Sequence, residues 1–179
     1  MELRELKKNE IQAYTRLLKD SFPPDERRED AEQRRLFERS AFHTLVPEKP
    51  GVEYNDWLSA FVSYWEFEEF CYLEHFAVSP RLRGQGLGQT ILAALIERLN
   101  QPLALEAEPP GTGKIAARRV AFYERSGFIL NHWDYIQPAY SADKSPVPLV
   151  FMTCPSAIDI GTFRRYRDVI YREAYGVIC

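Results

Sequence analysis

The order of apolar and polar positions along the chain predicts strands and helices in mixed order. Apolar runs rich in aromatic and β-branched residues favour strands, whereas apolar positions that recur every three or four residues favour helices. The pattern predicts strands at 2–6, 42–46, 57–65, 70–78, 103–108, 128–137 and 148–153. It predicts helices at 9–22, 24–39, 87–99, 113–126 and 158–175. Turns are predicted at Pro50-Gly51 and Asn55-Asp56, between the second and third strands.

The segment 24–39 carries acids and arginines at helical spacing, including the pairs Asp25/Arg28 and Asp30/Arg34. Ion pairs of this kind on an exposed helix face are weak. The segment therefore predicts a solvated helix rather than a docking surface.

Length and composition are those of an ordinary globular protein. With 179 residues, 45% of them hydrophobic and 27% charged, the chain is long enough to bury one core without disulfides or a metal. Its net charge of -3 argues against a nucleic-acid partner. It contains no signal-peptide core and no apolar run of membrane-spanning length, so we expect a cytoplasmic protein without membrane contact. Its three cysteines and three histidines have no metal-ligand spacing, so no metal is expected.

The most informative segment is the glycine-rich junction 78–88, which joins a predicted strand directly to a predicted helix. Such a junction binds anions, because backbone N–H groups can approach a phosphate closely and the helix N-terminus adds partial positive charge. Arg83 adds a fixed cation. The dinucleotide-binding pattern fails at Gln89 and the P-loop pattern fails at Ile115. A tight turn with no ligand explains the glycines equally well. The flanking residues therefore have to distinguish an anion-binding site from a simple turn.

The junction resembles the acetyl-CoA signature of the GCN5-related N-acetyltransferase (GNAT) family, through the run Arg83-Gly84-Gln85-Gly86-Leu87-Gly88. The lead-in strand 73–78 is similar to the family's, and so is the segment 120–128, in which an aromatic-Tyr pair precedes Gly-Phe. The resemblance implies an α/β (α+β) fold with a mixed, mostly antiparallel central sheet flanked by helices, over residues 1–154. Residues 155–179 are then a C-terminal helical extension, packed on the same domain or, alternatively, forming a homodimer contact.

The resemblance implies that the chain uses acetyl-CoA as a co-substrate and transfers the acetyl group to a neutral primary amine, by direct attack in a ternary complex. The backbone of Phe76, Ala77 and Val78 is then expected to pair with the pantetheine arm as a strand would. The N–H groups expected to hold the pyrophosphate are those of Arg83, Gly84, Gln85, Gly86, Leu87, Gly88 and Gln89.

Tyr123 matches the family position that protonates the departing thiolate. A phenol keeps its proton at neutral pH, which suits a general acid. Without the motif, an aromatic residue at helical spacing would be interpreted as a core tyrosine. The chain departs from the family at Ala116, where many relatives carry an asparagine that touches the cofactor; Lys114 and Arg118 are the candidates to replace it.

An amine acceptor arrives mostly protonated, so a base or a water chain has to remove a proton before the attack. Glu74 is the first candidate and Glu108 the second, with Glu106 a further candidate on the same face of the next strand as Glu108. The alternative for each is a solvated carboxylate or the partner of a nearby arginine. These carboxylates favour a cationic small molecule as the acceptor. The aromatic residues able to add cation–π contacts, most of them expected in the core, are Tyr54, Trp57, Tyr64, Trp65 and Tyr135.

Three function classes are open on the sequence alone. The preferred class is an N-acetyltransferase that acts on a small amine, with a protein amine as the second choice. The second class is a non-catalytic acyl-CoA-binding regulatory module, against which Tyr123 argues. The third is an acyltransferase that uses a different acyl-CoA or a different acceptor.

Overall fold

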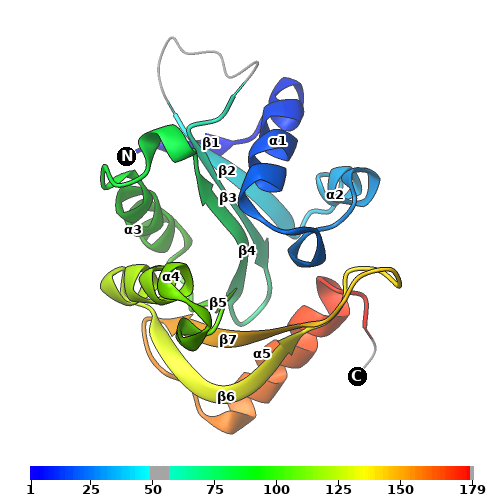
Figure 1. The fold of residues 1–179 in the computed structure, drawn as a ribbon, viewed down its shortest axis with the longest axis vertical. Helices are drawn as coiled ribbons and strands as arrows, with labels where there is room; N and C mark the ends of the chain where they lie inside the picture. The colour runs from blue at the N-terminus through cyan, green and yellow to red at the C-terminus, as the bar shows by residue number, and fades with distance from the viewer. Residues whose placement is uncertain (49–56, 178–179) are drawn as a thin grey trace. The chain divides into compact units, whose positions relative to one another are not determined.

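The computed structural model of the chain describes residues 1–48 and 57–177 (Figure 1). The turns predicted at Pro50-Gly51 and Asn55-Asp56 lie outside the described residues. The chain divides into two compact units. The first consists of Met1–Glu66 and Leu73–Asn100, and the second of Phe67–Tyr72 and Gln101–Cys179.

The first unit is built on strands in the order β1-β2-β3-β4. The pairs β1–β2 and β2–β3 are antiparallel, and Phe42 stands opposite Trp65 in the second pair. The strands are β1 Leu3–Glu5, β2 Phe42–Pro47, β3 Ala60–Glu66 and β4 Cys71–Val78. The helices are α1 Ile11–Ser21, α2 Asp30–Leu36 and α3 Leu87–Leu99, and short 3₁₀ turns occupy Lys8–Glu10, Pro24–Glu26 and Pro80–Leu82.

The core of the first unit lies between α1 and the strands. Residues 60–65 of β3 are all buried, so this strand is covered on both faces instead of alternating between buried and exposed positions. Tyr14 and Leu18 of α1 join Val46 and Phe61 in one hydrophobic cluster, and the rings of Tyr14 and Phe61 lie 4.6 Å apart. The helical spacing of these apolar positions explains why α1 buries this face.

The helix predicted at 24–39 is wrong in extent. α2 covers only Asp30–Leu36, and a separate 3₁₀ turn precedes it at Pro24–Glu26. Between them, Arg27 has extended backbone with φ -150° and ψ 157°, which a continuous helix does not allow. The segment is therefore an interrupted turn and helix.

The same segment is also less solvated than predicted. Arg28 and Gln33 are buried, and Gln33 Nε2 donates a 2.8 Å hydrogen bond to the Tyr14 phenol oxygen. Asp30 pairs with Lys19 of α1 at 2.7 Å, rather than with its predicted ladder partner. Tertiary contacts, which helical spacing does not encode, decide where these polar side chains go.

The second unit is built on strands in the order β5-β7-β6, and both pairs are antiparallel. The strands are β5 Leu103–Ala107, β6 Ile129–Gln137 and β7 Val147–Cys154. The helices are α4 Lys114–Arg125 and α5 Ile160–Glu173, and a 3₁₀ turn occupies Pro110–Thr112. The predicted fold class is confirmed, since the described residues form seven mostly antiparallel strands with flanking helices.

The C-terminal helix α5 packs on the strands of its own unit. The ring centroid of Phe163 lies 5.3 Å from that of Phe151 on β7 and 6.3 Å from that of Tyr135 on β6. The Asp159 carboxylate caps the helix by accepting a 2.9 Å hydrogen bond from the Thr162 N–H. Within the part of the chain that the structure describes, no helix combines the length and the apolar character needed to cross a bilayer.

Candidate functional site

The glycine-rich junction forms an open turn at the N-terminus of α3. Gly84 and Gly86 have φ of 77° and 78°, in the left-handed region that glycine adopts without strain. The Arg83 side chain donates a 3.0 Å hydrogen bond from Nε to the Val78 carbonyl, which closes the turn onto the end of β4. Residues 83–86 are exposed, and a Cβ added at either glycine would meet no atom within 4 Å.

This geometry suits an anion. The first N–H groups of a helix have no partner within the helix, and they carry the positive end of its dipole. In α3 these groups belong to Leu87, Gly88 and Gln89, directly after the open turn. A phosphate can therefore be held by backbone donors with little steric hindrance.

Glu74 lies on β4, four residues before the end of the strand, and forms a buried ion pair. Its Oε1 is 2.8 Å from Arg28 Nη1, and the two side chains are 0% and 7% exposed. Burial alone would raise the pKa of Glu74, but the Arg28 charge and the neighbouring His75 outweigh it and lower the pKa to about 2. A carboxylate with so low a pKa is a weak base at neutral pH.

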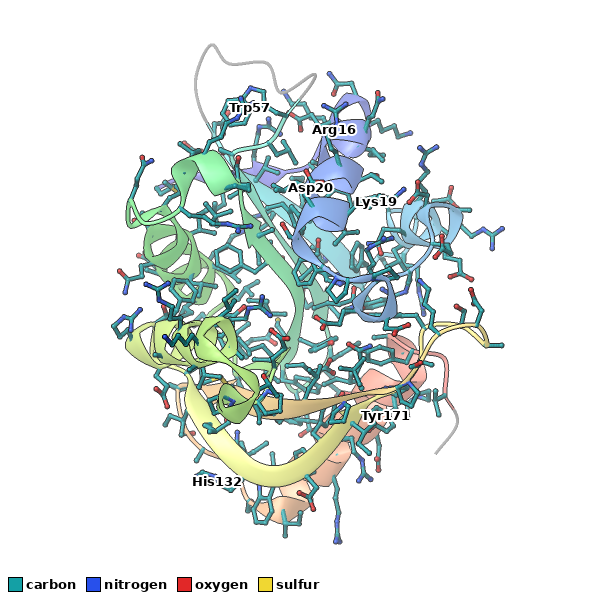
Figure 2. All side chains as sticks on the ribbon, viewed as in Figure 1. Arg16, Lys19, Asp20, Trp57, His132 and Tyr171 are labelled. Carbon is teal, nitrogen blue, oxygen red and sulfur yellow. The ribbon has the colours of Figure 1, made fainter. Side chains whose placement is uncertain are left out.

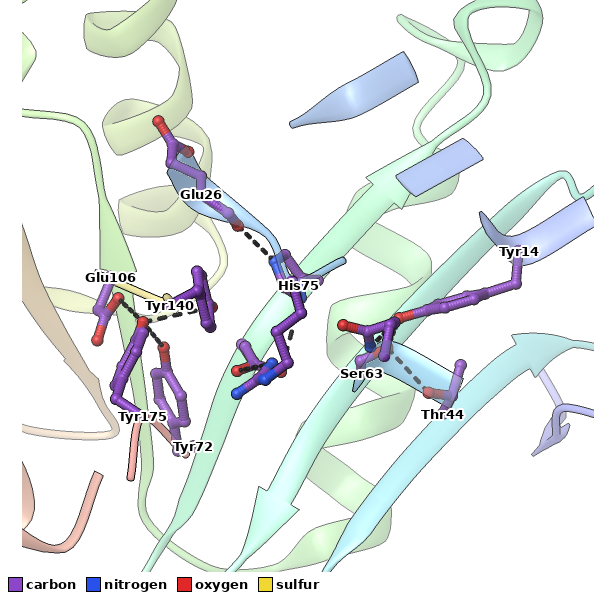
Figure 3. A network of polar contacts seen from close by, with 12 residues as sticks. Tyr14, Glu26, Thr44, Ser63, Tyr72, His75, Glu106, Tyr140 and Tyr175 are labelled. Carbon is purple, nitrogen blue, oxygen red and sulfur yellow. Dashed lines mark hydrogen bonds and ion pairs between the residues drawn. The ribbon is translucent and has the colours of Figure 1, made fainter. Parts of the chain in front are cut away.

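The histidines are packed or exposed imidazoles. His75 is buried, and its Nε2 donates a 2.9 Å hydrogen bond to the Glu26 carbonyl (Figure 3). His43 lies half-buried, 3.4 Å from a carboxylate oxygen of Glu5, and His132 is exposed on β6 (Figure 2). Among the described residues, no three of the side chains that bind metals lie close enough together to hold an ion.

Tyr123 lies on α4 in the second unit, with its ring packed edge-on against Phe122 and Phe128 at 5.3 and 5.7 Å. The residue is 6% exposed, and its phenol oxygen makes no hydrogen bond to another described residue of its unit. Burial raises the pKa of Tyr123 to about 12, against the opposing charge of Arg119. The phenol therefore keeps its proton at every physiological pH.

Glu108 lies just beyond the end of β5 and pairs with Arg119 of α4 at 2.9 Å. Both side chains are about one third exposed, at 38% and 34%. An ion pair with that exposure contributes little to stability. Glu108 is therefore the partner of a nearby arginine, which was the alternative to a role as the base. The ion pair leaves its carboxylate accessible to solvent.

Glu106 on β5 has different neighbours. Its Oε2 accepts a 2.9 Å hydrogen bond from the Tyr175 phenol, and its Oε1 accepts one from Tyr135. Tyr175 stands 69 positions later in the chain, and no spacing motif connects the two residues. Sequence reasoning named Glu106 but missed Tyr175.

The aromatic residues suggested for cation–π contacts are mostly in the core, as expected. Tyr64, Trp65 and Tyr135 are buried, whereas Trp57 is 41% exposed (Figure 2). Tyr54 lies outside the described residues. In α4, Ala116 is buried, while Lys114 and Arg118 are exposed.

Comparison with known proteins points to one family. A family model described as acetyltransferase (GNAT) family matches residues 11–128. A solved structure from Bacteroides thetaiotaomicron, whose name places that protein in the GNAT family, has a TM-score of 0.85 and 34% identity, and covers 99% of each chain. The ribosomal-protein-S18-alanine N-acetyltransferase from Escherichia coli has a TM-score of 0.62 at 20% identity, covering 88% of this chain and 95% of that one, which shows a shared fold.

One curated relative matches over a shorter segment. YjbC of Bacillus subtilis, which is named as an acetyltransferase, is 38% identical over 64 residues. The matched segment is 35% of this chain and 33% of YjbC, so it spans about a third of the relative's length.

Proposed function

Because the chain belongs to the GNAT acetyltransferase family, we propose that it transfers the acetyl group of acetyl-CoA to the primary amine of a small molecule. In the proposed reaction the neutral amine attacks the thioester carbonyl directly. The new C–N bond forms, the C–S bond breaks, the attacking nitrogen loses a proton, and the thiolate of coenzyme A takes one up.

The observation that carries the proposal is the open turn at 83–89. Two left-handed glycines, an arginine and the exposed N-terminus of α3 provide the donors that a pyrophosphate needs. Phe76, Ala77 and Val78 of β4 lead into this turn, and their backbone is proposed to pair with the pantetheine arm.

Tyr123 is proposed as the acid that protonates the thiolate. Its phenol holds its proton, because burial raises its pKa to about 12, and it makes no hydrogen bond to another described residue of its unit. A protonated phenol without a competing partner is suited to donate to an anion that develops during the reaction.

The base is proposed to be Glu74 or Glu108. The ion pair with Arg28 and the low pKa weaken Glu74 in this role, because the ionised form is already well stabilised. Glu108 is reachable from solvent, and its pair with Arg119 is weak. The structure of the two carboxylates thus favours Glu108.

Glu108→Gln is expected to lower kcat, and the loss is expected to grow as the pH falls, because the acceptor amine is then more fully protonated. Arg119→Gln is the matched control, since it breaks the same ion pair but keeps the carboxylate. Rates over a pH series measure both. Equal effects of the two variants would mean that only the ion pair matters, and would remove Glu108 as the base.

Gly86→Ala is expected to weaken acetyl-CoA binding about tenfold. A side chain at φ 78° costs about 1–2 kcal/mol, and relaxation of that strain would displace the backbone donors. Gly111→Ala is the control, because a Cβ there also meets open space and its backbone is not left-handed. Calorimetric titration gives both dissociation constants, and unchanged binding by Gly86→Ala would contradict the assignment of the turn.

The activity itself is tested by release of free thiol from acetyl-CoA in the presence of polyamines, amino acids, aminoglycosides and lysine peptides. We expect release with small amines. A rise in melting temperature with acetyl-CoA but no release with any amine would indicate a non-catalytic binding module instead.

A further inference from the structure

In the second unit, two tyrosine phenols donate to Glu106 and two more lie against one of those phenols. Together, Tyr72, Tyr135, Tyr140 and Tyr175 are called the tyrosine cluster. Tyr175 donates to Glu106 Oε2 at 2.9 Å, and Tyr135 donates to Oε1. The phenol oxygen of Tyr175 also lies 3.1 Å from that of Tyr72 and 3.5 Å from that of Tyr140 (Figure 3).

The cluster is assembled from four separate parts of the chain. Tyr72 comes from the start of β4, Tyr135 from β6, Tyr140 from the segment between β6 and β7, and Tyr175 from the residues after α5. Folding the unit is therefore what brings the four phenols and the carboxylate into one hydrogen-bonded group. Local sequence does not require any of these contacts.

Two of the phenols donate hydrogen bonds to the two carboxylate oxygens of Glu106. Burial and the charge of Glu106 both raise the pKa of Tyr135 and of Tyr175 well above the ordinary value, so both phenols remain donors. A carboxylate that accepts a hydrogen bond on each oxygen is stabilised as the anion and becomes a weaker base. Glu106 is thus better suited to hold a cation than to remove a proton.

The surroundings suit an organic cation. Tyr72 and Tyr135 are 1% and 4% exposed, whereas Glu106, Tyr140 and Tyr175 are half-buried, so the group of residues is only partly buried. Aromatic faces and a carboxylate are the groups that offset the cost of desolvating an alkylammonium.

We propose that Glu106 and the tyrosine cluster bind a second, non-reacting ammonium group of the acceptor, which is therefore a small linear diamine or polyamine. The inference rests on the proposed function, because it names the acceptor of that reaction. An ammonium held by Glu106 stays charged and cannot attack a thioester, so the amine that is acetylated must be another group of the same molecule.

The proposal gives the C-terminal segment a role. The Tyr171 phenol of α5 donates to the Ile136 carbonyl of β6, beside Tyr135, and the Val177 N–H donates a 2.9 Å hydrogen bond to the Tyr171 carbonyl. These contacts hold the segment that carries Tyr175. Tyr135 and Tyr175 act as positioning residues, through the carboxylate that they orient.

The test compares a linear diamine with the alkyl monoamine of the same length. For Glu106→Gln, KM for the diamine is expected to rise about tenfold or more, with KM for the monoamine and for acetyl-CoA unchanged. Tyr175→Phe is expected to raise KM for the diamine less, by about threefold to tenfold. Tyr166→Phe is the matched control, because it removes a hydroxyl from a tyrosine of the same unit whose ring stacks on Phe70, outside the tyrosine cluster, and KM for the diamine is expected to stay unchanged.

Two results overturn the proposal. An equal rise in KM for the two amines, or a fall in kcat for both with KM unchanged, means that Glu106 acts on the reacting amine. Unchanged kinetics with the diamine mean that Glu106 binds no part of the acceptor.

The binding of the diamine is also measured by calorimetry with wild type and Glu106→Gln, without acetyl-CoA. This measurement separates the inference from the proposed function. Diamine binding that is lost in Glu106→Gln supports the site even if no thiol is released with any amine, and binding that the substitution leaves unchanged overturns it.

Discussion

Tyr123→Phe is expected to lower kcat by about 10²- to 10⁴-fold, the usual contribution of a general acid, and to leave acetyl-CoA binding and stability nearly unchanged. The substitution removes only the hydroxyl, which makes no hydrogen bond to another described residue of its unit, while the ring still packs on Phe122 and Phe128. Steady-state rates, calorimetric binding of acetyl-CoA and urea unfolding of both proteins measure the three quantities.

The control for this variant is Tyr166→Phe, which removes a hydroxyl from another tyrosine of the same unit, whose ring is stacked 3.8 Å from Phe70. It is expected to keep full activity. Because the pKa of Tyr123 is raised to about 12, loss of its proton is not expected to limit the rate below about pH 11. Full activity of Tyr123→Phe would rule out the acid role, and lost acetyl-CoA binding would assign the residue a structural role.

Arg28→Met is expected to destabilise the protein by about 3–5 kcal/mol. The substitution removes the guanidinium that lies 2.8 Å from Glu74 and leaves a carboxylate with 0% exposure without that charge. Urea unfolding at neutral pH measures the loss. A change below about 1 kcal/mol would show that the pair contributes no more than a surface ion pair.

Two further measurements isolate this effect. Lys19→Met breaks an exposed pair, with side chains 44% and 43% exposed, and is expected to cost at most about 1 kcal/mol. Since the pKa of Glu74 is lowered from 4.5 to about 2, the stabilisation is present above about pH 4.5 and is lost as the pH falls toward 2. Wild type is therefore expected to lose more stability than Arg28→Met between about pH 5 and pH 3.

The parts of the fold that the sequence predicted well depend on local signals. The apolar stripe of α3, the glycines that precede it and the aromatic strands each carry a pattern within a few residues. Gly127, the residue directly after the helix predicted at 113–126, has a φ of 91° and follows the last turn of α4, as a glycine at the end of a helix commonly does. Such elements require no knowledge of distant contacts.

The sequence-based predictions failed where contacts between residues far apart in the chain determine the local structure. The segment 24–39 has the charge spacing of a solvated helix. In the structure Arg28 instead pairs with Glu74, 46 positions away, and the helix covers only Asp30–Leu36. The tyrosine cluster could not be predicted either, because Tyr72 and Tyr175 are 103 positions apart. The open turn at 83–89 could be predicted because its glycines lie within a few residues of one another. The polar groups of the proposed acceptor site depend on long-range contacts.

The central claim is that the turn at 83–89 holds the pyrophosphate of acetyl-CoA. The most direct test is titration of the ¹⁵N-labelled protein with acetyl-CoA, followed through the backbone amide resonances. We expect the largest shifts at the amides of Gly84, Gly86 and Gly88, which lie in the open turn and the first turn of α3. Saturable shifts confined to other parts of the chain, or no shifts at all, would contradict the claim.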